Sequence, residues 1–60
     1  SGITKFFYNS DSFLTKEIYS NQKDSSDIEV YYSYKDSLLN NIISNISFDD
    51  MILDFEEKYF

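Results

Sequence analysis

The chain has 60 residues, of which 11 are acidic and five are lysines, so its formal net charge is −6. It contains no His, Cys, Arg, Trp, Pro or Ala. This composition removes the imidazole, thiol and guanidinium groups on which most acid–base, nucleophilic and charge-stabilising catalysis depends. We therefore expect a non-enzymatic protein that acts by binding, with no cofactor and no metal.

The short length limits the hydrophobic core. A domain of this size buries only about 60% of the surface that its unfolded chain exposes, and small scaffolds usually add disulfides, a structural metal or oligomerisation. Because the chain has no Cys or His, oligomerisation is the remaining way to stabilise so small a fold. Because 42% of the residues are hydrophobic and 12 are Phe or Tyr, we expect a homodimer or an obligate partner to bury the surplus. We treat residues 2–60 as one domain and set Ser1 aside as an expression remnant.

The negative charge also restricts the partner. A nucleic acid or an anionic membrane would repel this chain, whereas the basic surface of a protein would attract it. Basic surfaces are common on proteins that handle nucleic acids, so a host nuclease, helicase or glycosylase is the expected target. No apolar run reaches the roughly 20 residues of a membrane span, and no basic leader precedes a hydrophobic segment, so the expected location is the cytoplasm.

In chain order, the first predicted element is a strand from Ile3 to Tyr8, rich in aromatic residues and followed by the polar turn formers Asn9 to Ser12. Phe13 to Tyr19 favours a returning strand. Leu14 and Ile18 lie four residues apart, however, so a short helix remains an alternative.

The segment from Ser20 to Asp27 has no apolar residue and is expected to be a solvated loop. Ile28 to Lys35 is the clearest strand, because apolar residues alternate with polar ones. The face expected to point to the core carries Ile28, Val30, Tyr32 and Tyr34. Tyr31 lies on the opposite, solvated face, where an amphipathic ring is a candidate contact residue.

The C-terminal third predicts two helices. Asp36 or Ser37 would cap the first helix, whose apolar stripe consists of Leu38, Leu39, Ile42, Ile43 and Ile46. Ser47 and Asp50 would form the capping box of the second helix. Its inward stripe would consist of Phe48, Met51, Ile52, Phe55 and Tyr59, with Leu53 and Phe60 off the stripe. The predicted fold class is therefore α+β: a small antiparallel sheet of two or three strands followed by two C-terminal helices packed on one face.

The candidate contact surface lies on the second predicted helix. Its acidic residues are Asp49, Asp50, Asp54, Glu56 and Glu57. On a helix, Asp50, Asp54 and Glu57 would line one ridge, with neighbouring charges roughly 5–6 Å apart, a spacing close to that of phosphates. The alternative is that the first acids stabilise the helix N-terminus and the others form a solvated face. The expected apolar anchors are Tyr31, Leu53, Tyr59 and Phe60.

Half of the residues are Phe, Tyr, Met, Ile, Asn or Lys, which is typical of an AT-rich coding sequence. With its small size and acidity, the chain resembles small acidic phage-encoded inhibitor proteins: DNA-mimic inhibitors of uracil-DNA glycosylase, anti-CRISPR proteins, and anti-defence proteins such as those against the Hachiman system. The resemblance implies an inhibitor of a host defence or nucleic-acid-handling enzyme in the host cytoplasm. Two alternatives stay open: a structural or assembly subunit that uses its aromatic surface, and a regulator that binds a transcription factor.

Overall fold

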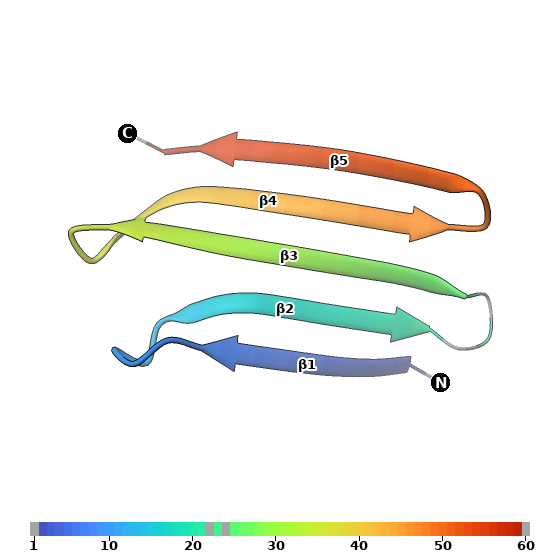
Figure 1. Cartoon of the computed structure of the whole chain (residues 1–60), viewed down its shortest axis with the longest axis horizontal. Helices are drawn as coiled ribbons and strands as arrows, with labels where there is room; N and C mark the ends of the chain where they lie inside the picture. The colour runs from blue at the N-terminus through green and yellow to red at the C-terminus, as the bar shows by residue number, and fades with distance from the viewer. Residues whose placement is uncertain (1, 22, 24, 60) are drawn as a thin grey trace.

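Over the residues that the computed structural model describes, 2–21, 23 and 25–59, the chain forms five strands (Figure 1). The strands are β1 (Gly2–Tyr8), β2 (Leu14–Asn21), β3 (Ser26–Lys35), β4 (Leu38–Phe48) and β5 (Met51–Lys58). They lie in the sheet in chain order, and each pairs antiparallel with the next. The fold is therefore all-β, and the prediction of an α+β fold with two C-terminal helices is wrong.

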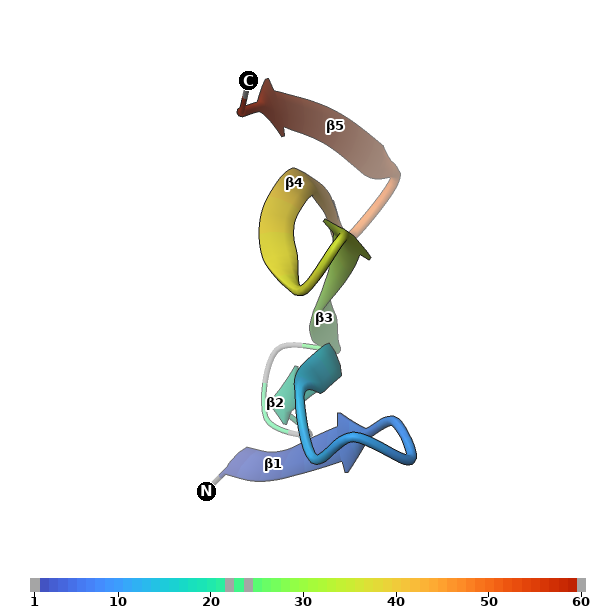
Figure 2. The same ribbon diagram turned by 90° about the vertical axis from the view of Figure 1, so that its left-hand side faces the viewer.

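The sheet is a single twisted layer. Figure 2 shows it from one end of the strands, with no second layer on either side. The Cα atoms span 39 × 21 × 11 Å. None of the described residues is fully buried, and β1 and β5 are exposed along their whole lengths. The most covered side chains belong to β2, β3 and β4, which have a strand on each side. The described residues thus form no closed hydrophobic core.

The predictions for the N-terminal half are largely confirmed. The strands expected at 3–8 and 28–35 are β1 and β3, and the segment expected at 13–19 is a strand rather than a helix, although it begins at Leu14. The loop expected at 20–27 is shorter, because β2 continues to Asn21 and β3 already begins at Ser26. Pairing between β2 and β3 provides hydrogen-bond partners for the backbone N–H and C=O groups of the polar residues at these strand ends.

Asn9 organises the turn between β1 and β2. Its side-chain Oδ1 accepts hydrogen bonds from the backbone N–H groups of Asp11 (2.9 Å) and Phe13 (3.0 Å). Its own N–H donates to the Phe13 carbonyl (2.9 Å), and its carbonyl accepts from Ser12 (3.0 Å). Ser12 has a φ of 68°, in the left-handed region. This is the Asx-type turn chemistry that the polar cluster predicts.

The first predicted helix is instead β4. Isoleucine, Asn and Ser are poor helix formers, because β-branching restricts χ1 and short polar side chains compete for backbone hydrogen bonds. The preceding Asp36 and Ser37 have φ values of 54° and 66°, which suit the two-residue type I′ turn of a hairpin. This turn directs the chain back along β3, so that Ile42 pairs with Tyr32 and Ile43 with Tyr31. Cross-strand pairing therefore overrides the helical spacing.

The second predicted helix is β5. Ser47 is a residue of β4 and caps no helix, and the chain turns at Asp49 and Asp50. Leu53 pairs with Ile46 across the ladder. Period-two alternation thus replaces the helical stripe, and the residues expected on one side of a helix are divided between two faces of the sheet.

Candidate protein-binding face

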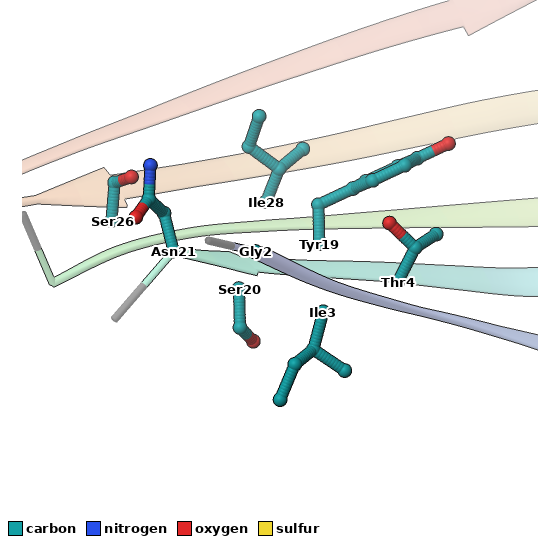
Figure 3. A pocket seen from close by; sticks show the side chains of 8 residues that line it. All are labelled: Gly2, Ile3, Thr4, Tyr19, Ser20, Asn21, Ser26 and Ile28. Carbon is teal, nitrogen blue, oxygen red and sulfur yellow. The ribbon is translucent and has the colours of Figure 1, made fainter. Parts of the chain in front are cut away.

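Alternation and register divide the strand residues between two faces. Cross-strand partners lie on the same face, and successive residues of a strand lie on opposite faces. Figure 3 shows this at one end of the sheet: Thr4, Tyr19 and Ile28 point to one side, whereas Ile3 and Ser20 point to the other. We call the first side the apolar face and the second the mixed face.

The apolar face carries large side chains from every strand. Its apolar members include Phe6, Tyr19, Ile28, Val30, Tyr32, Tyr34, Ile42, Ile46, Phe48, Met51, Leu53 and Phe55. They lie in cross-strand rows, for example Tyr19, Ile28, Ile46 and Leu53. The residues on the edge strands are exposed, for example Phe6 at 51% and Phe55 at 55%, whereas those on β2, β3 and β4 are half-buried. Such a continuous exposed apolar surface is characteristic of a contact site.

Glu17 is the polar centre of this face. It accepts hydrogen bonds from the hydroxyls of Tyr19 (Oε2, 2.5 Å) and Tyr32 (Oε1). The hydrogen bond to Glu17, followed by burial and the negative charge of Glu17, raises the pKa of Tyr32 to about 12. The same three causes, in the same order, raise the pKa of the Tyr19 hydroxyl. Each carboxylate oxygen thus has a tyrosine donor on the same face.

Two aromatic residues, Phe13 and Tyr34, contact each other at one end of the sheet. The Phe13 and Tyr34 rings lie 5.1 Å apart between centroids, tilted by 35°, and the Tyr34 hydroxyl donates to the Leu14 carbonyl at 2.6 Å. At the opposite end, an open hollow of about 460 Å³ is lined by Ser26, Ile28, Ile46, Phe48 and Asp49. A smaller hollow of about 270 Å³ lies along β1, β2 and β3 (Figure 3).

The mixed face is organised by charged groups. The Lys16 ammonium lies 5.5 Å from the Phe7 ring centroid and 5.2 Å from that of Tyr31. The Tyr31 hydroxyl donates to Glu29 at 2.5 Å, and this bond, with burial and the Glu29 charge, raises the Tyr31 pKa. Asn41 Nδ2 donates to Glu56 Oε2 at 3.0 Å. The mixed face also carries exposed apolar side chains, namely Ile3, Phe7, Leu38 and Ile52, but they alternate with charged and polar residues.

Charge is distributed unequally between the faces. Every lysine in a described strand lies on the mixed face, together with four acids; these residues are Lys5, Lys16, Lys35, Lys58, Asp27, Glu29, Asp54 and Glu56. Among the described strand residues, the apolar face carries only the charges of Glu17 and Glu57. The mixed face therefore has the composition of a solvated surface, and the apolar face that of an interface core.

The acidic residues singled out in the sequence do not form one ridge. Asp49 and Asp50 lie in the β4–β5 turn, Asp54 and Glu56 lie on the mixed face, and Glu57 lies on the apolar face. The predicted ridge of Asp50, Asp54 and Glu57 required a helix and is therefore wrong. Within the structure, Asp54 is instead in the same cross-strand row as Glu29, through Asn45.

The predicted apolar anchors are also separated. Tyr31 lies on the mixed face against Lys16, and Leu53 lies on the apolar face beside Ile46. Tyr59 follows β5; its N–H donates to the Asn40 carbonyl (2.8 Å) and its hydroxyl to Glu57 (2.8 Å), which raises the pKa of Tyr59. Phe60 is outside the described residues. The sequence reasoning missed the contribution of β4 and β5 to the apolar face, although the alternation of Met51, Leu53 and Phe55 was a usable signal.

Two other kinds of site are absent from the described part of the chain. No group of three or more His, Cys, Asp or Glu side chains is arranged to hold a metal ion. No helix among these residues has the length and apolar character needed to cross a membrane.

Comparisons with known proteins gave no relative: no family model, no curated protein sequence and no solved structure matches the chain.

Proposed function

We propose that this chain is a non-enzymatic assembly protein that functions by placing its apolar face against another polypeptide. One observation carries the proposal: at least twelve large apolar or aromatic side chains share one face of a single-layer sheet, and no element formed by the described residues covers them. An exposed apolar surface of this extent marks an interaction site in a protein that stays dispersed. The lysine-rich mixed face provides the solvated side of such an assembly.

Two adjacent residues of β4 allow a matched test. Ile42 lies on the apolar face and Ile43 on the mixed face, and both are half-buried. We expect Ile42→Lys to abolish capture of protein partners, including differently tagged copies of the chain, from a low-GC bacterial lysate. Ile43→Lys should keep them, and the wild-type complexes should resist high salt because apolar contacts are little screened. Equal capture by folded Ile42→Lys and wild type would contradict the proposal.

A second candidate function is inhibition of a host defence or nucleic-acid-handling enzyme, as the resemblance to phage inhibitors implies. Asp27, Glu29 and Asp54 line a hollow of about 400 Å³ on the mixed face, and cross-strand carboxylates at this spacing attract a basic protein surface. This complex, formed in the cytoplasm, would dissociate in high salt. Glu29→Lys combined with Asp54→Lys should remove the salt-sensitive partner; retention of that partner by the folded double variant would contradict inhibition through this surface.

A further inference from the structure

We infer that the polypeptide covering the apolar face is a second copy of this chain, so that two sheets stack into a β-sandwich dimer. This inference rests on the proposed function, since it names the partner of the same face. A different protein on this face, with the chain itself monomeric, is the outcome that would overturn the inference.

The exposed area agrees with one uncovered face per chain. A folded monomer of 7.1 kDa is expected to expose about 4,100 Å², whereas this chain exposes 4814 Å², an excess of about 700 Å². A sheet that spans 39 × 21 Å has a face of about 800 Å², which is the area that each partner contributes to a stable interface of standard size. One face-to-face contact therefore removes the excess.

The charge distribution favours a copy of the same face over a charged partner. The apolar face has no lysine among its described strand residues, so it offers no counter-charge to an acidic protein. Its two carboxylates already accept tyrosine hydroxyls, Glu17 from Tyr19 and Tyr32 and Glu57 from Tyr59. A basic protein would find more carboxylates on the mixed face. The surface that fits best is apolar and nearly uncharged, which describes the apolar face itself.

The middle row of the apolar face indicates how the two copies are related. This row runs across the sheet as Phe6, Glu17, Val30, Ser44 and Phe55, with Val30 on the central strand. A two-fold axis perpendicular to the strands would place Glu17 opposite Glu17 of the second copy, which brings two carboxylates together. An axis parallel to the strands instead places Glu17 opposite Ser44 of the second copy, a small residue that can donate a hydrogen bond.

The axis parallel to the strands also brings side chains of similar size opposite each other in the rest of the row. It places Phe6 opposite Phe55 of the second copy and Val30 opposite its own equivalent. Stacked sheets pack about 10 Å apart and cross at about 30°, so the middle row stays nearly in register at the axis. Large side chains then meet large ones at the edges, and the bulkier Glu17 meets the smaller Ser44. The structure thus assigns a dimer with its axis along β3.

The first test is the mass of the full chain by sedimentation equilibrium. We expect twice 7.1 kDa for the wild type. Ile42→Lys should weaken the dimer at least 100-fold, and Ile43→Lys less than threefold. A wild type that is monomeric at 100 µM would overturn the dimer, while the proposed function would survive if lysate capture still depended on Ile42. A dimer lost with Ile43→Lys but kept with Ile42→Lys would overturn both.

Cross-linking gives a second readout, because a covalent link reports which residues face each other in the dimer. The chain has no cysteine, so single cysteines can be introduced and treated with a short bismaleimide. Val30→Cys should give covalent dimers, and Ile43→Cys should not. A mixture of Glu17→Cys and Ser44→Cys chains should cross-link to each other, and neither should cross-link to itself. Efficient self-cross-linking of Glu17→Cys would overturn the parallel axis, and no cross-linking at Val30→Cys would overturn the apolar-face dimer.

Discussion

Replacing Tyr32 with Phe tests whether the hydrogen bonds around Glu17 stabilise the sheet. The substitution keeps the ring on the apolar face and removes only the hydroxyl that donates to Glu17 across the β2–β3 ladder. A pKa raised from 10 to about 12 corresponds to about 2.7 kcal/mol of preference for the protonated hydroxyl. Because the site is partly exposed, solvent screening reduces this value, and we expect Tyr32→Phe to lower the free energy of unfolding by about 1 kcal/mol.

The assay is urea unfolding followed by far-ultraviolet circular dichroism at fixed protein concentration, since association would shift the apparent stability. A double-mutant cycle with Glu17→Gln should show coupling between the two side chains, because they share a hydrogen bond. Tyr31→Phe is the matched control on the neighbouring position: it also loses a hydroxyl that donates to a glutamate, Glu29, but on the mixed face. We expect a smaller loss there, because that hydroxyl is more exposed.

The pH dependence follows from the raised pKa of Tyr32. In the folded chain Tyr32 ionises near 12, and in the unfolded chain near 10. Its contribution to stability is therefore complete below pH 10 and is lost as the pH rises from 10 through 12. The wild type should lose stability more steeply than Tyr32→Phe in this window. If the two proteins have the same unfolding free energy at pH 8 and the same decline above pH 10, the hydrogen bond does not stabilise the fold.

Three further predictions concern the turns and the mixed face. Asp49 has a φ of 50°, so Asp49→Gly should raise the urea midpoint by relieving a strain of about 1 kcal/mol; Asp50→Gly, where φ is not positive, should lower it. Asp36→Asn combined with Ser37→Gly supplies the preferred type I′ pair and should raise the melting temperature, and an unchanged or lower value would contradict the assigned turn. Lys16→Gln should reduce stability by about 0.5–1 kcal/mol in urea unfolding, because it removes the cation between two aromatic rings; a loss equally large in Lys16→Arg would show that the charge is not responsible.

The sequence predicts the N-terminal strands because local signals agree there. In β3, apolar residues alternate with polar ones, strand-forming residues dominate, and turn formers flank the segment. In β4 the signals conflict: Ile42, Ile43 and Ile46 have helical spacing, whereas their β-branching and the surrounding Asn and Ser favour a strand. The two-residue turn before β4 and the pairing with β3 make this segment a strand rather than a helix. The pairing involves residues distant in sequence, so local patterns in β4 do not reveal it.

The candidate site is less predictable than the fold, because the face that a residue occupies depends on register. A shift of one residue exchanges the two faces. Glu56 and Glu57 are neighbours in sequence, yet they lie on opposite sides of the sheet, and Leu53 belongs with Ile46 only because the Asp49–Asp50 turn sets that pairing. The composition indicates more large apolar side chains than a small core can bury. It does not indicate which of them share a face of the sheet.

Strand order has a consequence for how the chain folds. Among the described residues, each strand contacts only its neighbours in sequence, and the most distant ladder pair, Asp27 with Ser47, is 20 residues apart. Such a meander has no pairing between strands that are distant in sequence and is expected to fold by adding one hairpin strand at a time. The central β3–β4 hairpin has the longest ladder and should form the nucleus, while β1 and β5 join last and open first. Amide hydrogen exchange should therefore be slowest in the middle of the sheet and progressively faster toward both ends of the chain.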